Sequence, residues 1–196
     1  MTTHRFEIER LAPMPWRNGA GTTRELVCQP QGAGMAAFDW RVSIAHIARD
    51  GPFSTFEGVD RVITLLQGDG VRLRSAAGGF DHRLDTPLTP FAFPGDVPVD
   101  AELLAGASDD FNVMTRRATC RAHVQVLCAA SELAAAAQGL LMAVQGRWQV
   151  RGAASTSVTL AAGHGLWWST PSTPRRLEPL SPDAILLAVR VDPVSP

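Results

Sequence analysis

Short runs of alternating or wholly apolar residues, closed by Gly, Pro, Asp or Asn, recur along almost the whole chain. This spacing is typical of β-strands joined by tight turns. We expect strands at residues 6–11, 38–47, 61–67, 71–74, 91–93, 99–104, 111–116, 122–127, 140–144, 148–151, 157–160, 165–168, 175–177 and 184–191. Only residues 131–138 have a helical pattern, with Ser131 as its cap. The pattern predicts an all-β protein.

A weak internal repeat relates the two halves of the chain. Residues 62–68, followed by Val71, parallel residues 140–146, followed by Val150, and residues 91–93 parallel residues 166–168. A strand ending in Gly, a returning strand and a later aromatic strand are typical of a barrel of antiparallel hairpins. Coincidence among β-rich segments is the alternative. No linker separates the halves, so we expect residues 1–119 and 120–196 to form one compact unit.

Composition and charge exclude several classes of function. The 196 residues are 45 % hydrophobic and 19 % charged, with a formal net charge of -1, so we expect neither a nucleic-acid nor a membrane partner. The chain has no lysine and no tyrosine, which excludes Schiff-base chemistry, a P-loop lysine and a tyrosine general acid. A small-molecule ligand is the better expectation.

The cysteines and the first residues indicate a cytoplasmic protein. Cys28, Cys120 and Cys128 are odd in number and lack CxxC spacing, which argues against a disulfide framework or a cysteine zinc site. The first ten residues carry charges where a signal peptide needs an apolar run. No stretch approaches the roughly 20 apolar residues of a membrane span.

Residues 51–70 resemble the first cupin motif, in which two histidines and a glutamate precede a strand that ends in Gly. With Gly68 as the anchor, the glutamate position falls on Arg61 and the histidine positions fall on Ser54 and Phe56. Residues 93–99 resemble the second motif, Pro-x-Gly-x-x-His, but contain no histidine. These side chains are not ligands for a divalent transition metal. We therefore expect no metal and no cofactor.

A closer resemblance covers nearly the whole chain. The blocks that carry it are Pro-Trp-Arg-Asn-Gly-Ala-Gly-Thr-Thr-Arg-Glu at 15–25, Phe-Asp-Trp-Arg-Val-Ser-Ile-Ala at 38–45, Gly-Pro-Phe-Ser at 51–54, Gly-Val-Asp-Arg at 58–61, Phe-Ala-Phe at 91–93 and Asp-Phe-Asn-Val-Met-Thr-Arg-Arg at 110–117. In order and spacing they resemble the HutD/Ves family, with a less specific match after about Cys120. The resemblance implies a cupin-like (RmlC-like) bicupin of two antiparallel β-barrel or jelly-roll halves, a bacterial cytoplasmic location, an association with histidine utilisation and no established catalytic activity. Because cupins often pair through strands, it also makes a homodimer an expectation.

The segment from 16 to 25 combines an aromatic ring, a fixed cation, an amide, hydroxyls and a carboxylate. As a ligand-gripping loop it would contribute Trp16, Arg17, Asn18, Thr22, Thr23 and Glu25. The alternative is a turn, because Asn-Gly is a strong turn dipeptide and Glu25 could pair with a surface arginine. The residues support both interpretations equally.

Further candidate ligand-binding residues come from predicted strands. Alternation places Arg41 and Ser43 on one face, Arg61 at a barrel mouth, and Asn112 and Met114 together. Phe56 and Asp96 complete the set. Each has an alternative role: an ion pair with Asp39, Asp60 or Glu25 for the arginines, core packing for Met114, and a turn after Pro94-Gly95 for Asp96.

The leading hypothesis is a metal-free binding protein for a carboxylate metabolite, acting as a sensor or governor of histidine utilisation. Arginine can grip a carboxylate through two parallel hydrogen bonds, and urocanate or formylglutamate is the candidate ligand. The alternative is a metal-independent cupin enzyme, an isomerase or hydrolase, in which Glu25 and Asp96 or a histidine transfers the proton. The sequence identifies no set of nucleophile, base and orienting residue.

Overall fold

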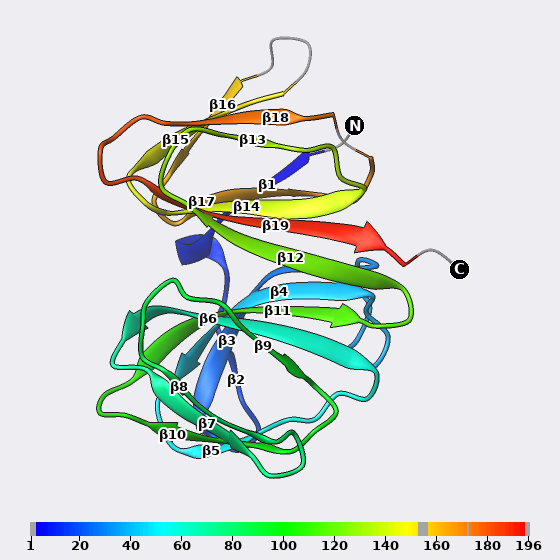
Figure 1. Cartoon of the computed structure of the whole chain (residues 1–196), viewed down its shortest axis with the longest axis vertical. Coiled ribbons are helices and arrows are strands. Elements are labelled where there is room, and N and C mark those ends of the chain that lie inside the picture. Colours follow the sequence, from blue (N-terminus) through cyan, green and yellow to red (C-terminus); the bar gives the residue numbers. More distant parts are fainter. Residues whose placement is uncertain (1–2, 153–156, 172, 195–196) are drawn as a thin grey trace. The chain divides into compact units, whose positions relative to one another are not determined.

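The computed structural model describes residues 3–152, 157–171 and 173–194. They form nineteen strands and one short 3-10 helix, η1 (Ile8–Arg10), and all strand pairs are antiparallel. The chain divides into two compact units (Figure 1), which are residues 12–121 and residues 1–11 together with 122–195. Residues 1–11 thus group with the C-terminal unit, whereas the sequence placed them in the N-terminal half.

The N-terminal unit consists of two sheets with an apolar core between them. The six-stranded sheet has the order β2 (Met14–Pro15), β3 (Gly21–Gln29), β4 (Trp40–Ile47), β11 (Ser108–Arg116), β6 (Val59–Gly68) and β9 (Phe91–Pro94). The four-stranded sheet has the order β5 (Gly51–Phe53), β10 (Val99–Leu103), β7 (Val71–Ser75) and β8 (Phe80–Leu84). Both sheets contribute to one buried cluster, including Ile63 and Leu65 from the first and Leu73 and Val99 from the second.

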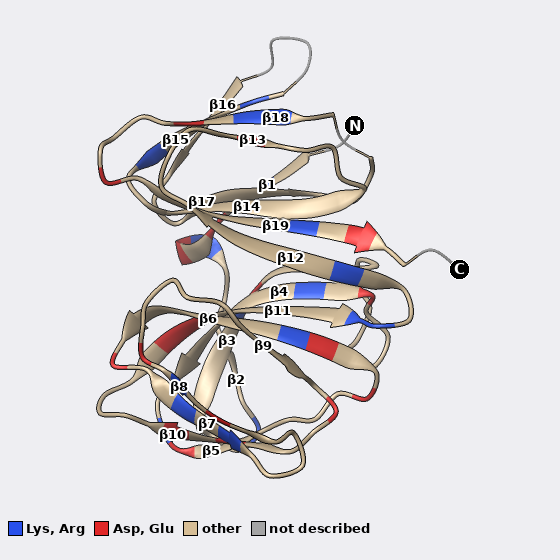
Figure 2. Cartoon of the chain, viewed as in Figure 1, with Lys and Arg blue, Asp and Glu red and all other residues tan. Residues whose placement is uncertain are grey.

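The register of the three central strands places polar side chains in rows on the core-facing side of the larger sheet. Met114 of β11 lies between Arg41 of β4 and Arg61 of β6, and two residues along β11, Asn112 lies between Ser43 and Ile63. Since side chains alternate along a strand, these residues share one face. The arginines lie within β4 and β6 (Figure 2) rather than in loops.

The C-terminal unit repeats this arrangement. Its five-stranded sheet has the order β1 (Thr3–Glu7), β17 (His164–Trp168), β14 (Gln138–Gln145), β19 (Ile185–Pro193) and β12 (Cys120–Leu127). Its four-stranded sheet has the order β13 (Ser131–Leu133), β18 (Arg175–Pro179), β15 (Arg147–Arg151) and β16 (Ser157–Ala161). Trp148 and Trp168, both fully buried, belong to the core between these two sheets.

The internal repeat predicted from sequence is confirmed in the strand order. β6 and β9 are neighbours as β14 and β17 are, and the strands that follow Gly68 and Gly146 return in the facing sheets. Both glycines have positive φ, 98° and 68°. Because a side chain is strained in this region, the repeated glycine is explained by the turn it makes.

Three sequence predictions of local structure are wrong. Residues 131–138 are not a helix, because Ser131–Leu133 pair with β18 as strand β13 and Gln138 already begins β14. Edge pairing and burial of Leu133 override the helical propensity of the alanines that follow. Residues 8–10 form η1 instead of continuing a strand, and the expected loop at 16–25 ends at Gly21, where the strand β3 (Gly21–Gln29) begins.

Candidate functional site

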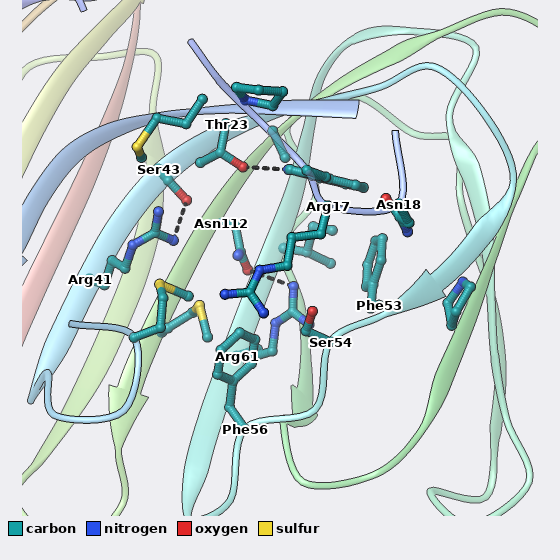
Figure 3. A pocket seen from close by; sticks show the side chains of 18 residues that line it. Arg17, Asn18, Thr23, Arg41, Ser43, Phe53, Ser54, Phe56, Arg61 and Asn112 are labelled. Carbon is teal, nitrogen blue, oxygen red and sulfur yellow. Dashed lines mark hydrogen bonds between the residues drawn. The ribbon is translucent and has the colours of Figure 1, made fainter. Parts of the chain in front are cut away.

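A pocket of about 670 Å³ lies in the N-terminal unit (Figure 3). Its lining comes from the segment before β3, from the core-facing rows of β4, β6 and β11, and from β5 with the residues after it. The lining residues are Met14, Pro15, Trp16, Arg17, Asn18, Thr23, Met35, Arg41, Ser43, Ala45, Pro52, Phe53, Ser54, Phe56, Arg61, Ile63, Asn112 and Met114. The lining contains three arginines and no carboxylate.

Arg61 is a buried cation without a carboxylate partner in the described part of the chain. Only 7 % of the residue is exposed, and its guanidinium carbon lies 5.0 Å from the ring centres of Phe53 and Phe93. Nη2 donates a long hydrogen bond of 3.5 Å to Oδ1 of Asn112, whereas Nε has no partner among the described residues. Burial, and secondarily the charge of Arg41, lowers the pKa of Arg61 to about 10, so it stays protonated at neutral pH.

Arg41 is equally buried but is partly neutralised. Its Nε donates to Oε2 of Glu25 at 2.7 Å and its Nη1 donates to Oγ of Ser43 at 3.1 Å. The residue is 5 % exposed, while the Glu25 side chain is 37 % exposed. The ion pair with Glu25, which the sequence left open, is therefore present, and Arg41 still contributes to the pocket wall.

Arg17 reaches the same space from the segment before β3. Its side chain extends toward Arg61 in Figure 3, and its guanidinium has no hydrogen-bond or ion-pair partner among the residues that the structure describes. Figure 3 shows the side chains of Arg17, Arg41 and Arg61 directed into the pocket from three different segments. The pocket therefore offers converging donors to an anion.

The segment from Trp16 to Ala20 is a turn and a pocket wall at once. The Asn18 side-chain oxygen accepts from the Ala20 amide at 3.0 Å, as expected of a turn. The Trp16 indole donates to Oγ1 of Thr23 at 2.7 Å and packs edge-on against Phe53 with ring centres 6.3 Å apart. The segment is therefore a turn and also part of the pocket wall, and the hydrogen bond to Thr23 holds the Trp16 indole in place.

Ten of the thirteen predicted ligand-binding residues line the pocket, and their contact with a ligand stays a prediction. Thr22, Glu25 and Asp96 do not line it. Thr22 precedes Thr23 on β3 and so faces the other way. Asp96 pairs with Arg117, with 3.1 Å between Oδ2 and Nη1, and this hydrogen bond lowers the pKa of Asp96. Of the two roles predicted for Asp96, a turn residue after Pro94-Gly95 therefore fits the structure better than a ligand-binding residue.

Eight lining residues were not among the predicted ligand-binding residues: Met14, Pro15, Met35, Ala45, Pro52, Phe53, Ser54 and Ile63. Alternation already placed Ala45 beside Ser43 and Ile63 beside Arg61, so these two could have been included. Met35 lies outside any strand, and nothing in the local sequence indicates its contact with the pocket.

Asp110 is a buried carboxyl group beside the pocket that the sequence analysis did not single out. It lies on β11 two residues from Asn112, between Ala45 of β4 and Leu65 of β6. The residue is 0 % exposed, and neither carboxyl oxygen has a hydrogen-bond partner among the described residues. Burial, and secondarily the charge of Asp109, raises the pKa of Asp110 to about 7.

The residues at the cupin metal positions do not fit a metal. Ser54, Phe56 and Arg61 do line the pocket, as the comparison with the cupin motif requires, but they offer one hydroxyl, one ring and one cation. Residues 93–99, which resemble the second motif, contain no histidine. In the described ranges no group of three His, Cys, Asp or Glu side chains could hold an ion. A buried guanidinium would repel a divalent cation here.

Over the described residues, the structure contains no helix with the length and hydrophobicity needed to cross a membrane.

Two solved structures show the same architecture over the whole chain. A conserved protein of unknown function from Pseudomonas aeruginosa has a TM-score of 0.86 at 33 % identity and covers 98 % of this chain and 100 % of its own. HutD from Pseudomonas fluorescens has a TM-score of 0.83 at 26 % identity, covering 99 % and 100 %. An oxalate decarboxylase from Lactobacillus farciminis, with a TM-score of 0.65 at 11 % identity over 97 % and 86 %, shows the cupin fold alone.

Sequence comparisons agree with the structural ones. Protein Ves of Cronobacter sakazakii is 40 % identical over 173 residues, which cover 88 % of this chain and 90 % of that protein. Protein Ves of Citrobacter koseri is 40 % identical over 93 % and 90 % of the two chains. The HutD family model matches residues 8–185. The family and the bicupin-type all-β fold expected from the sequence are therefore confirmed, and the chain belongs to the HutD/Ves family.

Proposed function

We propose that this protein binds a small carboxylate metabolite without a metal, and that it acts in the cytoplasm as a sensor or governor of histidine utilisation. The observation that carries the proposal is Arg61, a buried cation with no carboxylate partner among the described residues, at the wall of a pocket. Burying an unpaired charge costs several kcal/mol, and an anionic ligand would offset this cost.

The charges around the pocket favour an anion. Arg17, Arg41 and Arg61 line it, and the nearest paired carboxylate, Glu25, neutralises only Arg41. Arginine presents parallel N–H donors to the two oxygens of a carboxylate. A carboxylate could accept from Arg61 and Arg17 together, with Asn112 as a neutral neighbour.

The size and walls of the pocket suit a compact metabolite. A volume of about 670 Å³ is within the ordinary range for small-molecule sites. Trp16, Phe53, Phe56 and Ile63 supply apolar surface around the donors. Urocanate, with a planar ring, and formylglutamate, with two carboxylates, both match this combination. Histidine utilisation enters the proposal only as an expectation from the family resemblance.

The alternative, a metal-independent isomerase or hydrolase, receives less support. In one form of this alternative a histidine transfers the proton, but no histidine is among the described residues that line the pocket. In the other form Glu25 and Asp96 exchange a proton with the substrate, but Glu25 pairs with Arg41 while Asp96 pairs with Arg117. Only Arg41 of these four residues lines the pocket. Incubation with each metabolite tests for turnover, and product that disappears in Glu25→Gln would favour the enzyme.

The experiment that tests the proposal is a thermal melting screen with urocanate, formylglutamate, histidine and glutamate, each with and without EDTA. A ligand that binds only the folded state raises the melting temperature. We expect a shift with urocanate or formylglutamate that EDTA leaves unchanged and that Arg61→Met removes. Strong destabilisation by EDTA would contradict metal-free binding, and no shift with any of the four would contradict the ligand class.

A further inference from the structure

Arg175 is a second buried arginine, located in the C-terminal unit and outside the pocket described above. The residue is 5 % exposed and is the first residue of β18 (Arg175–Pro179). Its guanidinium carbon lies 4.4 Å from the ring centre of Trp168, which is itself fully buried. Nε and Nη2 are both buried and have no hydrogen-bond partner among the described residues. Burial lowers the pKa of Arg175, but an arginine stays charged at neutral pH.

The neighbouring carboxylates do not neutralise this cation. Glu132 of β13 pairs in register with Arg176, the outward-facing neighbour of Arg175. Glu178 lies three positions after Arg175 and forms ion pairs with Arg151 at 3.2 Å and Arg176 at 2.8 Å. Within the described residues, Arg175 therefore has no counter-ion, and the contact with Trp168 offsets the cost of burial only in part.

The two units place a buried arginine against equivalent rings. In the N-terminal unit, Phe93 of β9 pairs in register with Arg61 of β6, and the guanidinium of Arg61 lies over the Phe93 ring. In the C-terminal unit, the equivalent pair is Trp168 of β17 and Gly139 of β14. The cation over Trp168 instead comes from Arg175.

The arginine at this position is thus supplied by a different strand in each unit. Gly139 has no room for a side chain, because a Cβ there would lie 2.5 Å from Cζ2 of Trp168 and 2.5 Å from the Val189 oxygen. Arg175 on the facing sheet supplies the cation instead. In each unit a buried arginine lies over the aromatic ring at the equivalent position of the repeat, although the two arginines come from different strands. This recurrence indicates a role beyond filling the core.

We propose that Arg175 is the centre of a second anion site, in which the Nε and Nη2 edge binds the two oxygens of a small carboxylate. Nε and Nη2 are the edge with which Arg72 holds both carboxylate oxygens of Asp81, at 2.7 and 2.6 Å. The guanidinium lies over the indole of Trp168, and neither Nε nor Nη2 has a hydrogen-bond partner among the described residues. One arginine without a second cation suits a monocarboxylate.

The test is an NMR titration of the whole chain with sodium acetate, at constant ionic strength maintained with sodium chloride. The arginine Nε–H resonances are followed and are assigned with Arg175→Lys and Arg61→Lys. We expect the Arg175 resonance, together with the indole N–H of Trp168, to shift saturably in the wild-type protein and to shift equally in Arg61→Lys. This second result separates the site from the pocket of the proposed function.

Two outcomes would overturn the inference. One is an Arg175 resonance that stays fixed at every acetate concentration while other arginine resonances move. The other is a shift of Arg175 that disappears in Arg61→Lys, which would assign acetate to the first pocket. Both outcomes are measured on wild type and Arg61→Lys, which retain Arg175. If Arg175→Lys fails to fold and cannot be used for assignment, the indole N–H resonance of Trp168 identifies the site instead.

Discussion

Asp110 should make the stability of the protein fall as the pH rises from about 4 to about 7. Its carboxyl group has an ordinary pKa of 3.8 in the unfolded chain and a pKa of about 7 in the folded one. Below pH 4 the group is neutral in both states. Between these values the unfolded chain releases the proton while the folded protein retains it, so rising pH favours unfolding. Above pH 7 both states are ionised and the loss levels off.

The size of this effect follows from the pKa difference. The two pKa values differ by about 3, and each pKa unit corresponds to about 1.4 kcal/mol. The difference therefore amounts to about 4 kcal/mol of unfolding free energy. Asp110→Asn removes the ionisation and keeps a side chain of similar size. We expect the free energy of unfolding of the variant to gain about 4 kcal/mol relative to wild type between pH 4 and pH 8.

Urea denaturation followed by tryptophan fluorescence at several pH values measures this difference. Asp109→Asn is the matched control, because the Asp109 side chain is 38 % exposed and bonds Nδ1 of His46 at 2.7 Å. The control should keep most of the wild-type slope. Parallel pH profiles for wild type and Asp110→Asn would refute the reasoning, since they would show that Asp110 ionises alike in both states.

Three further predictions concern the pocket and the repeat. Glu25→Gln leaves Arg41 without its counter-ion, so calorimetry should show an anionic ligand bound about tenfold more tightly. Weaker binding would instead show that Glu25 itself contacts the ligand. Asp96 does not line the pocket, so Asp96→Asn should leave ligand affinity unchanged in the same titration. A loss of affinity would show that Asp96 contributes to binding after all. Gly139→Ala should lower the unfolding free energy by about 1–3 kcal/mol in urea denaturation, because its Cβ meets an indole ring. Gly34→Ala, with nothing within 4 Å, is its control, and equal effects would contradict the crowding argument.

Much of the fold could be predicted because its signals are local. Alternation grouped Arg41 with Ser43 and Asn112 with Met114, and in the structure both groups lie on the core-facing side of the sheet. The repeated Gly68 and Gly146 indicated two related halves, and both glycines have positive φ. The helix at 131–138 was predicted wrongly because pairing with β18 is a long-range contact that local propensity does not contain.

The site was less predictable because it depends on register and on approach from other strands. Glu25 of β3 lies opposite Ser43 of β4 and bonds Arg41 of the same strand, a contact between two strands that neither strand's sequence specifies alone. Asp110 and Arg175 are ordinary charged residues in sequence, and only burial without a described partner distinguishes them. Alternation from Asn112 would have placed Asp110 on the inward face, but not its lack of hydrogen bonds.

Isothermal titration calorimetry tests whether Arg61 holds a carboxylate ligand without a metal. The metabolite that raises the melting temperature is titrated into wild type and into Arg61→Met with EDTA present, and circular dichroism checks the fold of the variant. Removing one member of a buried, hydrogen-bonded charge pair costs about 2 kcal/mol or more. The account therefore predicts at least ~30-fold weaker binding in the variant. Equal affinity in the two proteins would contradict it, because Arg61 would then not hold the ligand.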